Sequence, residues 1–157
     1  ESQVQGLELG LNSRLWQGNG LTAPVRLAYT YTDGEITETA DDLSVQDGDV
    51  LPYLPENQLS LTLGLERPAQ WGAYLTTTYV DEVCVDNTCD RSNEPAFRST
   101  DDYLVVDLAA SYYLRSNVEL YAKVDNLFDD QEIVARSPDG ARPNSPRTAY
   151  MGVRVGF

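Results

Sequence analysis

The chain has 157 residues, a length that suits one domain or one piece of a larger domain. It carries 11 basic and 25 acidic residues and no histidine, and the resulting net charge of −14 argues against a surface that binds phosphate or nucleic acid. Its uninterrupted apolar runs are far too short for a membrane helix, so any crossing of a membrane has to be made by strands.

The N-terminal residues ESQVQGLELGL lack an initiator Met, a charged n-region and an apolar h-region. Their alternation of apolar and polar residues is already under way at the first positions. We therefore expect the native N-terminus, and with it any signal peptide, to lie upstream of this sequence.

Alternating apolar and polar residues predict about seven β-strands and no helix. In QLSLTLGLE (58–66), a leucine stands at every second position and faces one side, while Gln58, Thr62 and Glu66 face the other. The same alternation, weakest in the fourth stretch, occurs in residues 6–12, 25–31, 58–66, 73–80, 103–114, 118–126 and 148–157. Each predicted strand therefore has one apolar and one polar face.

The connections between these stretches alternate between short and long. Short turns occupy residues 16–20, 67–70 and 115–117, and long polar segments occupy roughly 34–53, 82–101 and 130–146. Long structureless loops are uncommon in compact soluble domains, whereas outer-membrane barrels combine short periplasmic turns with long extracellular loops. We therefore predict an all-β fold: an antiparallel meander of about seven strands that belongs to a larger transmembrane β-barrel.

Aromatic residues lie where such a barrel places its interfacial girdles. Trp16 and Trp71 stand at or beside short turns, and Tyr29, Tyr79 and Tyr112 are among the tyrosines near strand ends on the apolar side. Filling of a sandwich core would also use these side chains, but it would not explain the alternation of the loops.

The excess of acidic residues is concentrated in the long segments, which predicts a solvated and mutually repulsive surface. DGD (47–49) and DNTCD (86–90) offer carboxylate oxygens that could suit calcium. Neither has the ligand spacing of a known calcium loop, so no metal site is predicted.

Two cysteines, Cys84 and Cys89, lie close together in the second long segment. Without histidine or a second cysteine pair, a zinc site is disfavoured. A disulfide that closes a small loop is the preferred interpretation, and it indicates an oxidising compartment such as the periplasm or the cell exterior. Two free thiols are the alternative.

The C-terminal region carries N-L-F-D at residues 126–129, Pro146 and Arg147, and a final strand that ends in Phe157. This combination resembles TonB-dependent outer-membrane receptors. Their last two strands commonly read as a strand into N-L-F-D, a loop, then P-R and a strand that ends in Phe, and the corresponding positions here are Asn126 to Asp129, Pro146, Arg147 and Phe157. LPYLPENQLSLTLGLE (51–66) and QGLELGL (5–11) are similar to other strands of the family, and GARP (140–143) resembles the ferric dicitrate transporter branch.

The resemblance implies a barrel of about 22 strands around a plug, of which residues 1–157 would form the C-terminal part, without the plug and the segment that engages TonB. It implies active uptake of a ferric siderophore or another iron chelate across the outer membrane of a Gram-negative bacterium, with no cofactor. It also implies that Met151, Val153, Val155 and Phe157 form the signal for the barrel assembly machinery and face lipid.

The sequence offers no catalytic constellation, since it has no histidine and no nucleophile beside a base at motif spacing. Arg136, Arg142 and Arg147 are the candidate contacts for an anionic iron chelate, because guanidinium groups bind carboxylates in bidentate fashion. The preferred alternative for each is structural pairing with neighbouring acidic loops or, for Arg147, a structural role at the start of the strand. Three further basic residues, Arg26, Lys123 and Arg154, are expected to pair with acids across the polar face: Glu8, Asp107, Glu119 and Asp125.

Two other classes of protein share parts of this pattern. A passive porin or surface adhesin would have the same strands and loops without a plug. A secreted, soluble β-sandwich binding module would bury the apolar faces in a core instead of turning them to lipid.

Overall fold

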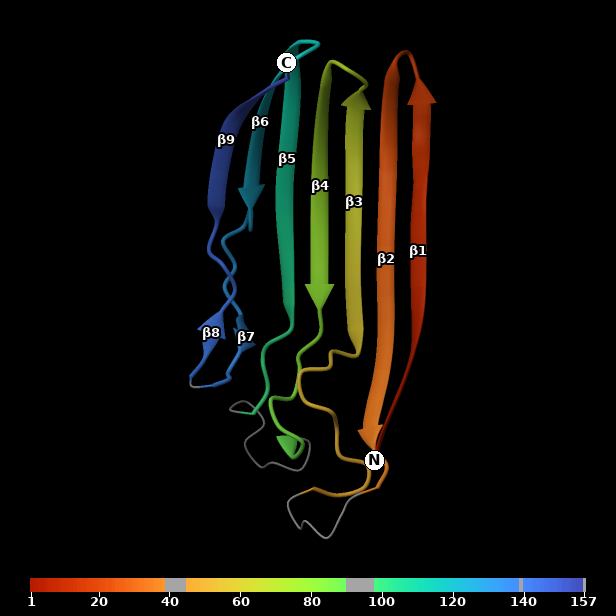
Figure 1. Cartoon of the computed structure of the whole chain (residues 1–157), viewed down its shortest axis with the longest axis vertical. Coiled ribbons are helices and arrows are strands. Elements are labelled where there is room, and N and C mark those ends of the chain that lie inside the picture. The colour runs from red at the N-terminus through yellow and green to blue at the C-terminus, as the bar shows by residue number, and fades with distance from the viewer. Residues whose placement is uncertain (39–44, 90–97, 139, 157) are drawn as a thin grey trace.

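The computed structural model describes residues 1–38, 45–89, 98–138 and 140–156, which form one large sheet and one small ribbon (Figure 1). Seven strands make an antiparallel sheet in the order β1-β2-β3-β4-β5-β6-β9, and β7 and β8 make the ribbon. The strands are β1 (Ser2–Gly18), β2 (Leu21–Ile36), β3 (Asn57–Arg67), β4 (Trp71–Val80), β5 (Tyr103–Arg115), β6 (Val118–Asp125), β7 (Ile133–Ala135), β8 (Arg142–Pro143) and β9 (Thr148–Val155). The predicted all-β meander of seven strands is confirmed.

Two strands extend further than the alternation predicts. β1 and β2 have 17 and 16 residues, and Gly34, predicted to begin a long loop, pairs with Val4 inside the sheet. The β7–β8 ribbon within residues 130–146 was also not predicted. Its strands have three and two residues, too few to show an alternation.

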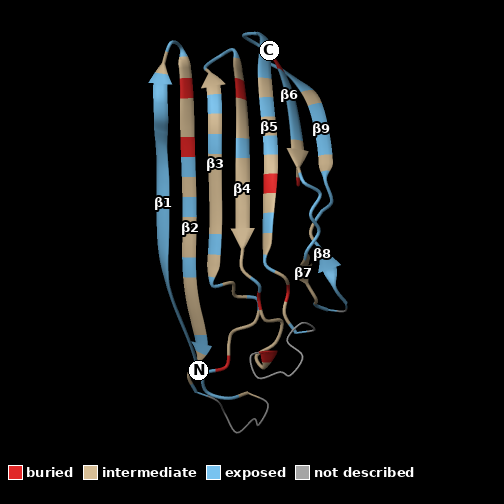
Figure 2. Ribbon diagram, turned by 180° about the vertical axis from the view of Figure 1, so that it is seen from behind, coloured by how far each residue is buried: buried red, intermediate tan, exposed pale blue. Residues whose placement is uncertain are grey.

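The register brings the apolar positions of all seven strands onto one face. One row runs across five strands through Leu9, Tyr29, Leu59, Tyr79 and Leu104. No second layer covers this face within the described residues, and Figure 2 shows β1 as exposed along most of its length. A continuous apolar face of this size exceeds what a soluble monomer exposes, and it has the pattern that barrels turn to lipid.

The exposed fractions of the side chains on this face support the same conclusion. Leu9 is 53% exposed, Leu63 is 40% exposed and Met151 is 87% exposed, whereas the buried hydrophobic residues are only Val25, Val83, Cys89 and Val106 in the described part of the chain. The leucine faces therefore do not form the core of a sandwich within this chain.

The polar face carries paired charges. Arg154 contacts Glu119, and Lys123 contacts Asp125, as predicted. The hydroxyl groups of Thr62 and Thr76 lie 3.0 Å apart on adjacent strands. Arg154–Glu119 and the two threonines join adjacent strands, whereas Lys123 and Asp125 lie on the same strand, so this face is stabilised by polar contacts between and along strands.

All three short turns lie at one end of the sheet and the long connections lie at the other (Figure 1). In the first turn, Asn19 and Gly20 both have positive φ, 52° and 74°, which is the backbone of a tight two-residue hairpin. Bulges at Leu15 and Leu114 lie near this same end. The fold thus separates a turn end from a loop end, and the candidate site lies at the loop end.

Candidate functional site at the loop end

The three long loops, residues 37–56, 81–102 and 126–147, are joined to one another by backbone hydrogen bonds. The amide of Tyr53 in the first loop donates to the Cys84 carbonyl in the second, at 2.8 Å. The second and third loops are joined twice, because Asp101 N–H donates to the Ile133 carbonyl and Ile133 N–H donates to the Asp101 carboxylate, both at 2.8 Å. The loops therefore form a connected unit.

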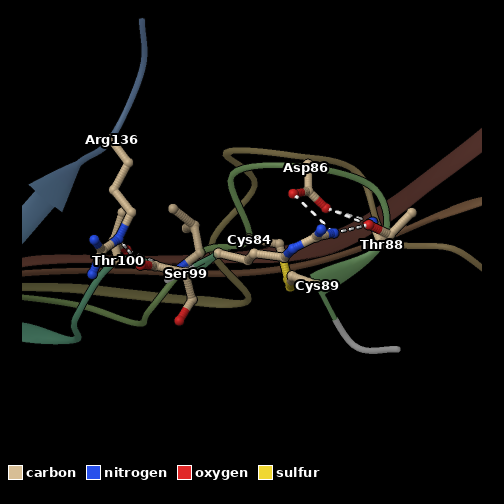
Figure 3. Close-up of a disulfide and its surroundings, with 9 residues drawn as sticks. Cys84, Asp86, Thr88, Cys89, Ser99, Thr100 and Arg136 are labelled. Atoms are coloured by element: carbon tan, nitrogen blue, oxygen red, sulfur yellow. Dashed lines mark hydrogen bonds and ion pairs between the residues drawn. A yellow bond between two sulfur atoms is a disulfide. The ribbon is translucent and has the colours of Figure 1, made fainter. Parts of the chain in front are cut away.

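Cys84 and Cys89 form a disulfide, as predicted (Figure 3). Residues 83–85, around the first cysteine, pair with residues 98–100, near the end of the second loop. Val85 N–H donates to the Arg98 carbonyl at 2.8 Å, and Thr100 N–H donates to the Val83 carbonyl at 2.9 Å. The disulfide therefore closes a small loop that begins where Cys84 pairs with Ser99.

Asp86, one of the carboxylates considered for calcium, is used inside this loop. It accepts hydrogen bonds from the backbone and hydroxyl of Thr88, both at 2.8 Å, and lies 3.5 Å from the Arg98 guanidinium. Burial alone would raise the pKa of Asp86, but these partners outweigh it and lower the pKa below its usual value. Within the described ranges no group of three His, Cys, Asp or Glu residues could hold a metal ion, and Asp90 lies outside them.

Arg136 links the third loop to the other two. Its Nε donates to the Ser99 carbonyl in the second loop, and its backbone N–H donates to the Tyr53 hydroxyl in the first, at 3.4 Å. Figure 3 shows the side chain reaching toward Ser99 and Thr100. Arg136 therefore has a structural role between the loops, in which its guanidinium donates to the Ser99 carbonyl.

Arg147 supports the base of the third loop. Its backbone N–H donates to the Asp129 carboxylate at 2.7 Å, and its guanidinium donates to the Leu127 carbonyl at 3.4 Å. Arg142 lies exposed on β8, where the structure gives its side chain no hydrogen bond or ion pair with any described residue. The ligand-binding role of the three arginines stays a prediction, and the structure does not bring them together at one cavity.

The N-L-F-D motif closes the third loop through Asn126. This residue has a φ of 51° and is only 3% exposed. Its amide nitrogen donates to the carbonyls of Asp130 and Ser145, at 2.8 and 3.0 Å, so it joins the two ends of the loop. The motif contributed to the resemblance to the receptor family, but its role in closing the loop was not predicted from the sequence.

An open cavity of about 750 Å³ lies between the first and second loops. Its walls combine apolar side chains such as Leu51, Leu54 and Tyr79 with four acids: Glu56, Asp81, Glu82 and Asp102. None of the three predicted arginines lines it. This cavity was not predicted from the sequence, although the acidic pairs at residues 81–82 and 101–102 mark the end of β4 and the start of β5.

Asp81 lines this cavity and links the start of β3 to the end of β4. Its carboxylate accepts hydrogen bonds from the Asn57 side chain at 2.6 Å, the Asn57 backbone at 3.0 Å and the Tyr79 hydroxyl at 2.7 Å. Burial by itself would raise the pKa of Asp81, but the bonds from Tyr79 and Asn57 outweigh it and lower this pKa. The ionised form is therefore the one that the fold stabilises.

This lowered pKa makes a pH-dependent prediction for Asp81→Asn. Because the folded pKa lies below the unfolded value of about 3.9, the carboxylate contributes stability above that pH and loses it as the pH falls through the folded pKa. We expect Asp81→Asn to cost about 1–2 kcal/mol near neutral pH and progressively less below about pH 4. Urea unfolding of both forms across this range measures the difference.

Asp130→Asn is the matched control, because the Asp130 carboxylate has no hydrogen bond or ion pair with a residue in the described part of the chain, so its substitution should leave the stability unchanged. A cost of Asp81→Asn that stays constant into acid would contradict the assignment of Asp81 as the titrating group.

A second prediction concerns Arg136. We expect Arg136→Ala to loosen the three loops, because it removes a charge-assisted hydrogen bond worth about 1.5–3 kcal/mol to the Ser99 carbonyl. Limited proteolysis of the intact protein should show faster cleavage within residues 81–102 and 126–147, with the barrel strands still protected. Arg142→Ala, in the same loop, should leave the cleavage rate unchanged. Equal rates for all three proteins would show that Arg136 does not join the loops.

The geometry above defines a class of protein: a segment of transmembrane barrel wall, with one apolar face, one charged face and joined long loops at one end. A model of the TonB dependent receptor-like β-barrel matches residues 1–127. The chain belongs to this family. No curated protein sequence matches the chain.

Solved structures share the fold along nearly the whole chain. The siderophore receptor PiuA from Acinetobacter baumannii is similar with a TM-score of 0.76 and 25% identity, over 98% of this chain and 22% of that one. The ferric-catecholate import receptor Fiu from E. coli K12 has a TM-score of 0.74 and 22% identity, over 99% and 21% of the two chains. The ferric yersiniabactin uptake receptor FyuA from Yersinia pestis has a TM-score of 0.69 and 16% identity, over 99% of this chain and 24% of that one. The chain thus spans between a fifth and a quarter of their lengths.

Proposed function

We propose that this chain is part of the barrel wall of an outer-membrane receptor for active, TonB-dependent uptake of a ferric siderophore or similar iron chelate in a Gram-negative bacterium. The family match over residues 1–127 carries the proposal, and receptors named for siderophores and ferric chelates are among its structural neighbours. The long loops would be extracellular and the short turns periplasmic.

In this proposal the barrel wall breaks no bond. The loops and a plug outside this segment capture the chelate, and energy relayed through TonB moves the plug so that the chelate can pass. The last strand would carry the signal for the barrel assembly machinery at Met151, Val153, Val155 and Phe157; Phe157 lies outside the described residues. The side chains of Met151 and Val153 are well exposed on the apolar face, as a lipid-facing signal requires.

Ferric citrate is the finer candidate for the transported ligand, suggested by the GARP stretch at residues 140–143. The three loops hold 17 acidic and 5 basic residues, so a polycarboxylate ligand would need direct contact with arginine to overcome repulsion. Arg142 is the best placed of the three predicted arginines, because Arg136 and Arg147 already hydrogen-bond to loop carbonyls.

Uptake of radioactive iron tests this function. The complete receptor chain would be expressed in iron-starved cells that lack their own receptors, with and without TonB, and supplied with ferric citrate or with a ferric catecholate. We expect accumulation of at least one chelate only when TonB is present. Accumulation without TonB would instead indicate a passive porin, and no accumulation in either strain would reject iron-chelate uptake.

The ferric citrate proposal has its own control pair. Arg142→Ala should lower ferric citrate uptake, while Asn144→Ala in the same loop should not. Uptake of the catecholate alone would withdraw ferric citrate and leave the broader function standing.

A further inference from the structure

A groove at the turn end of the sheet carries an arginine whose donors are largely unused. The groove has a volume of about 660 Å³ and lies between the first turn, residues 17–22, and Arg67, Pro68 and Gln70 of the second. Arg67 pairs with Trp71 across the β3–β4 hairpin and, by alternation, belongs to the same face as Leu63 and Leu65. The groove therefore opens at the edge of the apolar face.

Most of the hydrogen-bond donors of the Arg67 guanidinium lack an acceptor among the described residues. Its only hydrogen bond with a described residue runs from Nη2 to the Asn19 carbonyl, at a long 3.3 Å, and its Nε is buried without a partner among those residues. A guanidinium offers several N–H donors in a planar fork, and a buried donor without an acceptor is costly. The buried Nε is not accessible to a ligand, but the terminal Nη groups of Arg67 make no other hydrogen bond with a described residue and can donate to an acceptor in the groove.

The turn end also has the opposite charge balance to the loop end. Around the turns lie four basic residues, Arg14, Arg67, Arg115 and Arg154, and two acids, Glu66 and Glu119. Both acids are engaged on the polar face, Glu66 by the Tyr74 hydroxyl and Glu119 by Arg154. Arg14 and Arg154 lie on the polar face, where Arg154 pairs with Glu119. An anion approaching the apolar face therefore meets the charge of Arg67, whose sequence neighbour Glu66 faces the other side of the sheet.

The surroundings of Arg67 suit a molecule with an anionic head and apolar tails. Trp71 lies across from it, and Trp16 lies near the neighbouring hairpin, as expected of interfacial aromatic residues. Leu65 and Leu63, 44% and 40% exposed, continue from Arg67 along the strand. Long basic side chains at such positions extend to the headgroup level of the bilayer.

We propose that the groove at Arg67 binds the phosphate of an anionic phospholipid, with the acyl chains lying along Leu65 and Leu63. Bidentate donation by the guanidinium fits a phosphodiester, and the apolar face fits the tails. The proposal rests on the membrane placement given above, but not on the identity of the transported ligand.

Native mass spectrometry of the complete receptor in micelles tests the proposal. Phosphatidylglycerol is titrated in as the probe, diacylglycerol serves as the lipid without phosphate, and inorganic phosphate serves as competitor. We expect one tightly held phosphatidylglycerol, no comparable diacylglycerol, and no displacement by inorganic phosphate. Arg67→Ala should weaken phosphatidylglycerol binding about tenfold, because it removes charge-assisted hydrogen bonds.

Two variants control for the fold and for general charge. Arg67→Lys keeps the charge without the planar fork and should fall between wild type and Arg67→Ala. Arg14→Ala removes a basic residue at the same end but on the polar face, and should bind as wild type does. Sheet circular dichroism establishes that each variant is folded.

Binding by Arg67→Ala within twofold of wild type, or equal losses in Arg14→Ala, would overturn the proposal. Displacement by inorganic phosphate would assign the groove to a soluble anion instead of a lipid. Iron uptake is measured in parallel, so that a failure of the transport function is seen separately from a failure of lipid binding.

Discussion

Asn126→Ala is expected to destabilise the barrel by about 3 kcal/mol, since it leaves two carbonyls without their donor and places alanine in a left-handed backbone conformation. The buried amide of Asn126 holds the carbonyls of Asp130 and Ser145, and its backbone N–H donates to Asp107 on β5 at 2.9 Å. The substitution should therefore separate the two ends of the third loop, while the backbone bond to Asp107 remains possible. Urea unfolding of the complete receptor in lipid vesicles measures the loss.

Two variants separate the causes of this loss. Asn126→Gly removes the amide but tolerates the φ of 51°, so it should be about 1 kcal/mol less damaging than Asn126→Ala. Asn144→Ala removes another amide that donates to the Asp130 carbonyl, at 3.1 Å, but from an exposed position. We expect that change to cost less than about 1 kcal/mol. Equal effects at positions 126 and 144 would show that burial of Asn126 is not what matters.

Leu61→Arg should cost about 2–4 kcal/mol, because it places a charge near the middle of the face that we assign to lipid. Leu61 lies in the centre of β3, between Leu27 on β2 and Thr77 on β4. The cost should fall toward the strand ends, where a long side chain reaches the interface. The measurement is the free energy of folding into vesicles.

Ser60→Arg is the matched control for Leu61→Arg. Ser60 is adjacent in sequence but faces the polar side of the sheet, between Ala28 and Thr78. It should cost about 1 kcal/mol or less, since charged groups are already present on that face. If Ser60→Arg proves the more damaging change, the two faces are assigned the wrong way round and the leucines pack in a core.

The strand pattern was predictable because alternation is a local property. Every second residue of a strand faces the same side, so the alternating leucines of residues 58–66 predict a strand with one apolar face from the local sequence alone. The ends of strands are set by pairing instead. Gly34 is inside β2 because Val4 on β1 extends far enough to pair with it, and no local pattern at Gly34 reveals this.

The candidate site was less predictable. The acidic and basic residues of the long loops were identified, and the Cys84–Cys89 disulfide followed from two nearby cysteines. Sequence alone could not show that Arg136 would reach Ser99, because that contact depends on how loops separated by whole strands meet in space. The acidic cavity between the first and second loops was missed for the same reason.

By itself, the sequence determined the all-β class, the two faces of each strand, the alternation of short turns with long loops and the resemblance to TonB-dependent receptors. Each of these features depends on local residue spacing or on a short motif. The tertiary structure decided which charges are free to act. It engaged Arg136 and Arg147 with carbonyls, buried Asn126 as the closure of a loop, and left Arg67 with unused donors at the turn end. Hydrogen bonding and burial depend on neighbours distant in the chain, so only the folded sheet could assign them.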